Sequence, residues 1–257
     1  MPQIRVSAQL QPQHSDWSQM RAAWADAEAL GADCLFNWDH FFPLNGPPAG
    51  KHFEALTVLA AMAEVTERVE LGSLVICNSY RNPELLADAH RTIDHISGGR
   101  AILGIGAGWF EHDYDEYGYE FGTVGSRISD LEAALPRIED RFGKLNPPPV
   151  RGHIPILIGG GGVKRTLKLV ARHADIWHAF GDVGVFTEKN AVLDGHCADE
   201  GRDPAAIERS WAVGRMGGNP DALREAGVSH FIVGISGSES GYDLGQLREL
   251  VAWRDAL

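Results

Sequence analysis

Cysteine is scarce in this chain, and the spacing of its three cysteines excludes two kinds of structural site. Cys34, Cys77 and Cys197 stand far apart and form no CxxC pair. Zinc sites and disulfide frameworks both require closely spaced or numerous cysteines. Neither is expected here, and no metal site is predicted. Cys34 and Cys77 lie in apolar, strand-like segments, where a reduced and buried thiol is the expected state.

Positive charge is also in short supply. The chain has 23 Lys and Arg against 35 Asp and Glu, which gives a formal net charge of −12. No run of basic residues concentrates the cations that are present. A nucleic acid is a polyanion and would be repelled by this balance. We therefore expect no nucleic-acid partner.

Long apolar runs are missing as well. No segment approaches the roughly 18 to 20 apolar residues that a membrane-spanning helix needs. The N-terminal sequence MPQIRVSAQLQPQ has no basic segment followed by an apolar stretch, so it does not look like a secretory signal. We expect a cytoplasmic protein without a membrane partner.

Strand-like and helix-like segments alternate along the whole chain. Eight strand–helix repeats in 257 residues are typical of an α/β fold, the (β/α)8 TIM barrel. The triple-proline segment at 145–155 falls inside this alternation, so a single domain over residues 1–257 is expected. The expected strands are 4–9, 34–38, 70–76, 101–105, 156–158, 176–178, 209–213 and 231–233. The expected helices are 17–30, 55–66, 83–96, 127–142, 164–173, 187–200, 222–226 and 244–253.

The alternative fold is a doubly wound open sheet. Its nucleotide-binding fingerprint, GxGxxG, should follow the first strand directly. Ala8-Gln9-Leu10-Gln11 occupies that place in this chain. The barrel is therefore the preferred prediction.

Residues 71–109 carry the clearest local signals. They indicate a buried strand, a polar turn, a helix, a glycine stop and a second buried strand, which together predict a parallel sheet. Asn82 suits an N-cap, Pro83 the first helical position and Glu84 an acid of the first turn. Gly98-Gly99 suits the end of the helix. The helical spacing predicts one buried face, made of Leu86, Ala89, Ile93 and Ile96.

The C-terminal ends of the strands should meet at one mouth of the barrel, where TIM-barrel active sites form. These ends are rich in polar, aromatic and glycine residues, whereas the opposite ends carry mostly charged residues or small residues without a chemical group. This asymmetry predicts an active-site face. The mouth positions are Gln9, Gln11, Asn37, Trp38, Asp39, His40, Cys77, Asn78, Gly106 to Trp109, Gly159 to Gly162, His178, Gly214, Arg215 and Gly234.

Two motifs at this face could carry chemistry. Asp39-His40 follows the second strand, and its histidine could act as a general base or hold a polar substrate group. A partly buried histidine that only satisfies its own hydrogen bonds is the alternative, and the position favours function. The four glycines 159–162 precede a helix, so their N–H groups fit a phosphate, with Lys164 and Arg165 nearby. A tight turn is the alternative, but it would not need four glycines.

Two further segments are less specific. The glycines of GIGAGW (104–109) fit either a flat ring over the backbone or close packing of a strand against a helix, and the sequence favours neither. Within 111–122, His112, Asp113 and Glu116 could be imagined as metal ligands. Their spacing is unconvincing, so a solvated loop with tyrosines packed on the barrel rim is expected. A structural role is expected for His90, His95, His173, His196 and His230.

Three groups of residues together resemble a known family. They are WDHFFP after the second strand, LGSLV with RNPELLADAHRTIDHISGGRAILGIGAGW through the third and fourth, and PILIGGGG with LVARHADIW at the fifth and sixth. This combination is similar to the bacterial luciferase-like superfamily, and most similar to its actinobacterial branch of F420-dependent oxidoreductases. The resemblance runs from about residue 4 to residue 177. The resemblance is less decisive about whether the cofactor is F420 or flavin mononucleotide (FMN).

The resemblance implies a homodimer of (β/α)8 barrels, with a deazaflavin or flavin ring in each mouth. It implies that His40 faces the reacting carbon, as an acid or base held by neighbours that include Asp39, and that Asp39 contacts the ring. It also implies a non-proline cis peptide between Leu74 and Val75. The other implied cofactor contacts are Val75 and Cys77 against the ring, Ala107, Gly108 and Trp109 along its edge, and Gly160, Gly161, Gly162 and Val163 at the phosphate.

Two departures from the family pattern narrow the expected activity. Trp109 stands where the sugar-phosphate dehydrogenase branch has a glutamate, so that activity is not expected. Residues 211–231 leave no room for a large lid, so the substrate site should be open or completed by a dimer partner. The leading hypothesis is hydride transfer between F420 and a small organic substrate. The alternatives are an FMN-dependent monooxygenase and a non-catalytic cofactor-binding protein.

Overall fold

A computed structural model describes residues 3–214 and 217–257, so the predicted mouth residue Arg215 lies outside the described residues. Within the described part, parallel strands follow one another in chain order around the molecule. They are β1 (Arg5–Gln11), β2 (Cys34–Asn37), β3 (Glu70–Ser73), β4 (Ile76–Cys77), β5 (Ala101–Gly106), β6 (Ile156–Gly159), β7 (Ile176–Ala179), β8 (Glu208–Val213) and β9 (His230–Ser238).

These strands close into a barrel. Strand β9 returns to pair in parallel with β1, with Arg5 opposite His230 and Gln11 opposite Ser236. Strands β3 and β4 together occupy the third strand position of the barrel, and both pair with β5. The predicted (β/α)8 barrel is confirmed, and the open-sheet alternative is wrong because the first and last parallel strands pair with each other. The short β10 (Gly241–Tyr242) adds an antiparallel partner to β9.

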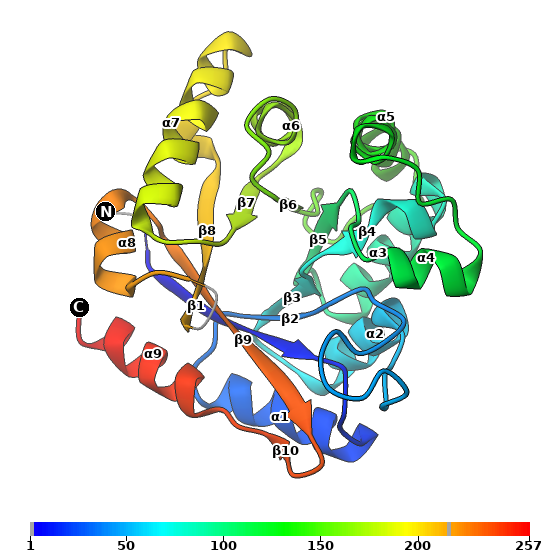
Figure 1. Ribbon diagram of the computed structural model, residues 1–257, viewed down its shortest axis with the longest axis vertical. Helices are drawn as coiled ribbons and strands as arrows, with labels where there is room; N and C mark the ends of the chain where they lie inside the picture. The colour runs from blue at the N-terminus through cyan, green and yellow to red at the C-terminus, as the bar shows by residue number, and fades with distance from the viewer. Residues whose placement is uncertain (1–2, 215–216) are drawn as a thin grey trace.

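Helices surround the strands on the outside (Figure 1). None of the helices in the described part is long and apolar enough to cross a membrane. They are α1 (Trp17–Ala29), α2 (Ala55–Val65), α3 (Pro83–Ile96), α4 (Glu111–Tyr117), α5 (Val124–Phe142), α6 (Thr166–His173), α7 (Val183–Asp199), α8 (Pro220–Ala226) and α9 (Gly245–Asp255), with the 3-10 turns η1 (Asn78–Tyr80) and η2 (Pro204–Ala206).

The apolar side chains form separate cores on the two faces of the sheet, because successive residues of a strand point to opposite sides. Phe36, Ile102 and Leu157 belong to the cluster inside the barrel. Alternate strand residues, such as Leu35 and Leu103, join the larger core beneath the helices. Two half-buried residues pack on the inner cluster from the mouth: Leu74 and Val75.

The third strand position differs from the single strand 70–76 that was expected. It is interrupted between β3 and β4, where the peptide bond from Leu74 to Val75 is cis. The family resemblance implied a cis bond at this position, and the structure confirms it. Gln9 donates a hydrogen bond from Nε2 to the Leu74 carbonyl at 2.6 Å, so a side chain of β1 holds the interruption in place.

Helix α3 begins as predicted, but a different face of it is buried. Asn82 Oδ1 accepts the Leu85 N–H at 2.9 Å, and proline occupies the first turn. Of the four residues expected to be buried, Ala89 is only half-buried and Ile96 is 42% exposed. The helix packs against α2 and α5 as well as β5, which rotates its inner face. The buried positions are Leu86, Ala87, His90, Ile93 and Asp94.

Candidate functional site at the C-terminal mouth

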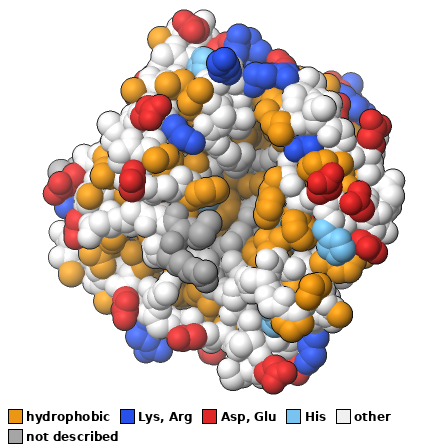
Figure 2. Space-filling view, in the orientation of Figure 1, with side chains coloured by type: hydrophobic (Ala, Val, Ile, Leu, Met, Phe, Trp, Pro, Cys, Tyr) orange, Lys and Arg blue, Asp and Glu red, His pale blue; other side chains and the backbone are white. Residues whose placement is uncertain are grey.

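The strands of the barrel deliver the predicted site residues to one end. Asp39 and His40 follow β2, Cys77 ends β4, Gly106 ends β5 and Gly159 ends β6. All these strands run parallel, so their C-terminal ends form a single mouth. Figure 2 shows a molecular face that is hollowed near its centre, with hydrophobic side chains along the hollow.

His40 is the main chemical group at this mouth. Its side chain is 11% exposed, and its Nδ1 lies 2.7 Å from Oδ2 of Asp113. The rings of Trp38, Trp109 and Phe110 meet the imidazole edge to face, with centroids 5.4 to 5.7 Å away. With Nδ1 engaged, Nε2 is the ring nitrogen left for chemistry.

Trp38 is itself held by a neutral histidine. Its indole Nε1 donates to Nε2 of His52 at 3.0 Å, and the planes of the two rings are nearly parallel, 9° apart. Burial lowers the pKa of His52 to about 4. At neutral pH the ring is therefore uncharged and can accept this hydrogen bond. An uncharged hydrogen bond to His52 thus holds Trp38, one of the aromatic rings around His40, in place.

Asp113 is the functional residue that the sequence prediction missed. Residues 111–117 were expected in a solvated loop, but they form helix α4, with Asp113 and Tyr114 buried. The signal for a helix was present: acids at 111 and 113 in the first turn, and Gly118 in the left-handed conformation at the end. The described residues contain no cluster of three or more metal-ligating side chains. The buried carboxylate serves His40 instead.

Asp39 does not hold His40, contrary to expectation. Its two carboxylate oxygens accept from Arg81 at 2.5 and 2.9 Å, and Oδ2 also accepts the Cys77 N–H at 2.9 Å. Arg81 in turn donates to Glu54 at 2.7 Å. Asp39 therefore ties the end of β2 to the end of β4. Its contact with a cofactor ring stays a prediction.

The glycines of 104–109 make room for neighbouring protein atoms. A Cβ on Gly106 would lie 2.8 Å from Val75 Cγ2, and one on Gly159 would lie 2.9 Å from Val75 Cγ1. A Cβ on Gly108 would overlap the Tyr114 hydroxyl and Cys77 Sγ. Close packing therefore requires glycine at 106 and 108, and the contact of this segment with a flat ring stays a prediction. The neighbours that pack on these glycines belong to the interrupted third strand position and to α4.

Replacing Gly106 with alanine is expected to lower the free energy of unfolding by about 1–3 kcal/mol, because the added methyl overlaps Val75. In a Val75→Ala background the same change should cost less than half as much, because the overlapping methyl groups are gone. Urea unfolding of the four proteins measures the difference. Equal costs in the two backgrounds would contradict this explanation.

The glycine loop after β6 lies open at the surface. Gly160 has a φ of 124°, and Gly160, Gly162 and Val163 are exposed. Arg165, expected to add charge here, turns away and donates to Glu132 of α5 at 2.7 Å. A cation from α7 lies beside the loop, where Lys189 Nζ reaches the space over Gly161. A backbone loop with a lysine beside it fits a bound anion.

The remaining predicted contacts lie around the same mouth. Ala107 and Gly108 follow β5 and are half-buried, and Trp109 is 64% exposed. Cys77 is buried, its Sγ lies 3.1 Å from the Tyr114 hydroxyl, and burial raises the pKa of its thiol. The thiol therefore stays protonated near neutral pH, as expected for a buried, reduced cysteine.

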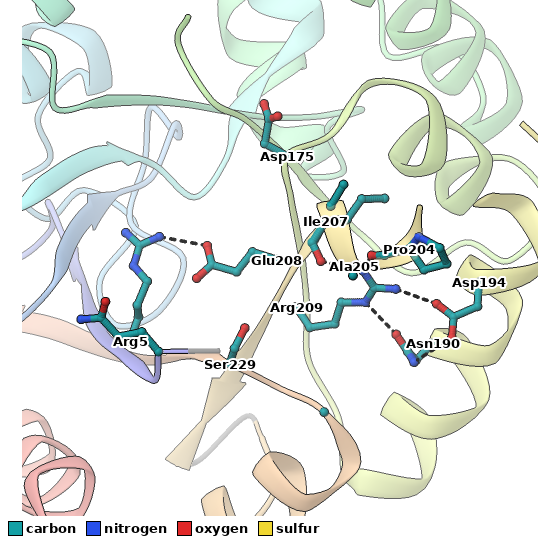
Figure 3. A pocket seen from close by; sticks show the side chains of 13 residues that line it. Arg5, Asp175, Asn190, Asp194, Pro204, Ala205, Ile207, Glu208, Arg209 and Ser229 are labelled. Carbon is teal, nitrogen blue, oxygen red and sulfur yellow. Dashed lines mark hydrogen bonds and ion pairs between the residues drawn. The ribbon is translucent and has the colours of Figure 1, made fainter. Parts of the chain in front are cut away.

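A pocket of about 690 Å³ lies at the opposite, N-terminal end of the barrel (Figure 3). Its charged side chains already have partners in the protein. Arg209 donates to Asp194 at 2.6 Å and to Asn190 at 2.8 Å, and Arg5 donates to Glu208 at 2.9 Å. Because these groups are already satisfied, we assign the pocket a structural role.

The fold and the site define a TIM-barrel protein whose chemically active side chains gather at the C-terminal mouth. A sequence model of the luciferase-like monooxygenase family matches residues 2–249. The chain belongs to that family.

Two curated relatives are mycobacterial. The phthiodiolone/phenolphthiodiolone dimycocerosates ketoreductase of Mycobacterium tuberculosis is 27% identical over 241 residues, which cover 80% of this chain and 63% of the relative. An uncharacterized protein of the same species is 30% identical over 132 residues, which cover 46% of this chain and 47% of the relative. This chain thus matches between about half and two thirds of the length of these relatives.

Solved structures show the same architecture. An F420-dependent secondary alcohol dehydrogenase in complex with an F420-acetone adduct has a TM-score of 0.83 at 14% identity, covering 100% of this chain and 98% of that chain. The coenzyme F420 dependent tetrahydromethanopterin reductase of Methanopyrus kandleri has a TM-score of 0.78 at 18% identity, covering 98% of each. A long-chain alkane monooxygenase has a TM-score of 0.72 at 12% identity, covering 91% of this chain and 87% of that chain. These likenesses establish the fold.

Proposed function

We propose that this protein is an F420-dependent oxidoreductase that interconverts a small organic carbonyl compound and its alcohol by hydride transfer. The observation that carries the proposal is His40, with a free Nε2 at the mouth and its Nδ1 held by a buried carboxylate. Support also comes from the relatives: one is a ketoreductase, and both F420-dependent structures match at least 98% of this chain.

The residues present fit a deazaflavin or flavin cofactor. Leu74 and Val75 offer a half-buried apolar surface that suits a flat ring. The exposed glycine loop and Lys189 suit its phosphate. We assign Trp109 to the edge of the ring and Cys77 to its lining, as the family resemblance implies. We assign the cofactor to these residues, with F420 as the proposed group and FMN as the alternative.

A bound deazaflavin would supply or accept a hydride. The protein must then align the substrate, exclude water and manage one proton. In alcohol oxidation, neutral His40 accepts the hydroxyl proton at Nε2. In carbonyl reduction, protonated His40 returns that proton to the substrate oxygen. The aromatic rings of Trp38, Trp109 and Phe110 pack around the imidazole, whose side chain is 11% exposed, and this packing limits the access of water to it. The cytoplasmic location and the homodimer stay predictions.

The first test is a titration of the purified protein with F420 and, separately, with FMN, followed by fluorescence anisotropy. Tight binding of F420 with weak binding of FMN is the expected result. A preference for FMN would move the protein to the monooxygenase alternative. Binding of neither would contradict the cofactor site. Reduction of F420 by 2-propanol would then separate an enzyme from a protein that only binds the cofactor.

A further inference from the structure

We infer that Asp113 sets the tautomer of His40 and thereby decides whether Nε2, the ring nitrogen left for chemistry at the mouth, carries a lone pair or a proton. The catalytic meaning of this inference rests on the proposed function, whereas the tautomer itself depends only on contacts within the protein. Asp113 reaches His40 from helix α4, 73 residues further along the chain. It is a positioning residue, since it acts on the substrate through His40.

Three donors converge on the Asp113 carboxylate, which is fully buried. His40 Nδ1 lies 2.7 Å from Oδ2, the Tyr80 hydroxyl donates to Oδ2 at 3.3 Å, and the Phe41 N–H donates to Oδ1 at 3.1 Å. An ionised carboxylate only accepts hydrogen bonds. The proton of the neutral imidazole must therefore sit on Nδ1, which leaves a lone pair on Nε2.

This tautomer is the one that the proposed chemistry needs. A lone pair on Nε2 can accept a hydroxyl proton, whereas an Nε2–H group cannot act as the base. The other tautomer would place the lone pair on Nδ1, facing the carboxylate in a buried site. That arrangement sets two acceptors against each other and is unfavourable.

The backbone of Phe41 makes Asp113→Asn a directional test. Its N–H needs an acceptor at the position of Oδ1, so the asparagine carbonyl oxygen should take that position. The amide NH2 then replaces Oδ2 and donates to Nδ1 of His40. An isosteric change should thus move the imidazole proton to Nε2, with little change in shape or volume.

The tautomer can be read from long-range ¹H–¹⁵N correlation spectra of ¹⁵N-histidine-labelled protein, at a pH where the imidazole is neutral. The signals of His40 are those lost in His40→Gln. We expect protonated Nδ1 in the wild type and protonated Nε2 in Asp113→Asn. Protonated Nε2 in the wild type, or an unchanged pattern in a folded Asp113→Asn, would overturn the inference. If Asp113→Asn does not fold, Asp113→Ala is the second variant, and it too should lose the Nδ1–H pattern.

Kinetics with F420 and 2-propanol then test the consequence. Asp113→Asn should lower kcat by roughly 10²-fold or more, with the Kd for F420 within about threefold of wild type. Asp115→Asn is the matched control, because Asp115 lies on the same helix and is exposed. Tyr80→Phe removes one donor and should leave the tautomer in place. Failure to bind F420 would refute the proposed function alone, since the spectra do not need the cofactor.

Discussion

Replacing His40 with alanine is expected to lower kcat for F420 reduction by 2-propanol by roughly 10²- to 10⁴-fold, the usual contribution of a positioned acid or base. The substitution removes the free ring nitrogen at the mouth. It leaves the apolar surface at Leu74-Val75 and the glycine loop untouched, so the Kd for F420 should change little. A loss confined to kcat would show that His40 stabilises the transition state and does not contribute to cofactor binding.

His153→Ala is the matched control for this experiment. His153 is 63% exposed and pairs with Asp175, which lines the pocket at the opposite end of the barrel. Its loss should leave kcat unchanged. Full turnover in His40→Ala with F420 still bound would refute the proposed role of His40. Loss of F420 binding in that variant would assign His40 to the cofactor site instead.

Replacing Arg100 with alanine is expected to lower the free energy of unfolding by about 3–5 kcal/mol, since several buried acceptors would lose their donor. The Arg100 side chain is buried and has no carboxylate partner among the described residues. Its guanidinium donates instead to carbonyl groups at the C-terminal ends of α2 and α3, where the helix dipoles favour a cation, and to the carbonyl that precedes β3. These contacts span 2.7 to 2.9 Å, and the acceptors are the carbonyls of Ala63, Thr66, Val69 and Ser97 and the hydroxyl of Thr66.

Urea unfolding measures this effect, and two variants serve as comparisons. Arg137→Ala breaks an exposed ion pair with Glu84 and should cost about 0–1 kcal/mol. Arg100→Lys keeps the charge but has fewer donors in a different geometry, so it should recover less than half of the loss. A cost of under 1 kcal/mol for Arg100→Ala would show that water satisfies these carbonyls when the guanidinium is removed.

The sequence was sufficient to predict the architecture, because at every strand position of the barrel an apolar strand is followed by a helix. Asn82, Pro83 and Gly98 marked the ends of α3 through local chemistry that needs no tertiary context. The cis bond at Leu74-Val75 came from the family resemblance alone. Periodicity alone did not give the buried face of α3, because contacts with α2 and α5 rotate it.

The partners within the site were the part that could not be predicted. Asp39 adjoins His40 in sequence, yet its carboxylate is drawn to Arg81, and the partner of His40 comes from another connection of the barrel. Likewise Arg165 adjoins the glycine loop in sequence, yet it pairs with Glu132 of α5, and a lysine of α7 reaches the loop. Sequence proximity places a residue at the mouth, but side-chain direction selects its partner, and that direction depends on packing.

The pairing of β1 with β9 has a consequence for biosynthesis. Strand β1 leaves the ribosome before the other strands of the barrel, but one of its two edges finds its partner only when residues 230–236 have been translated. Until then the nascent chain carries an open parallel edge, a surface that favours misassembly with other chains. Closure of the barrel therefore waits until strand β9 has left the exit tunnel, and the edge of β1 is exposed to other chains until then.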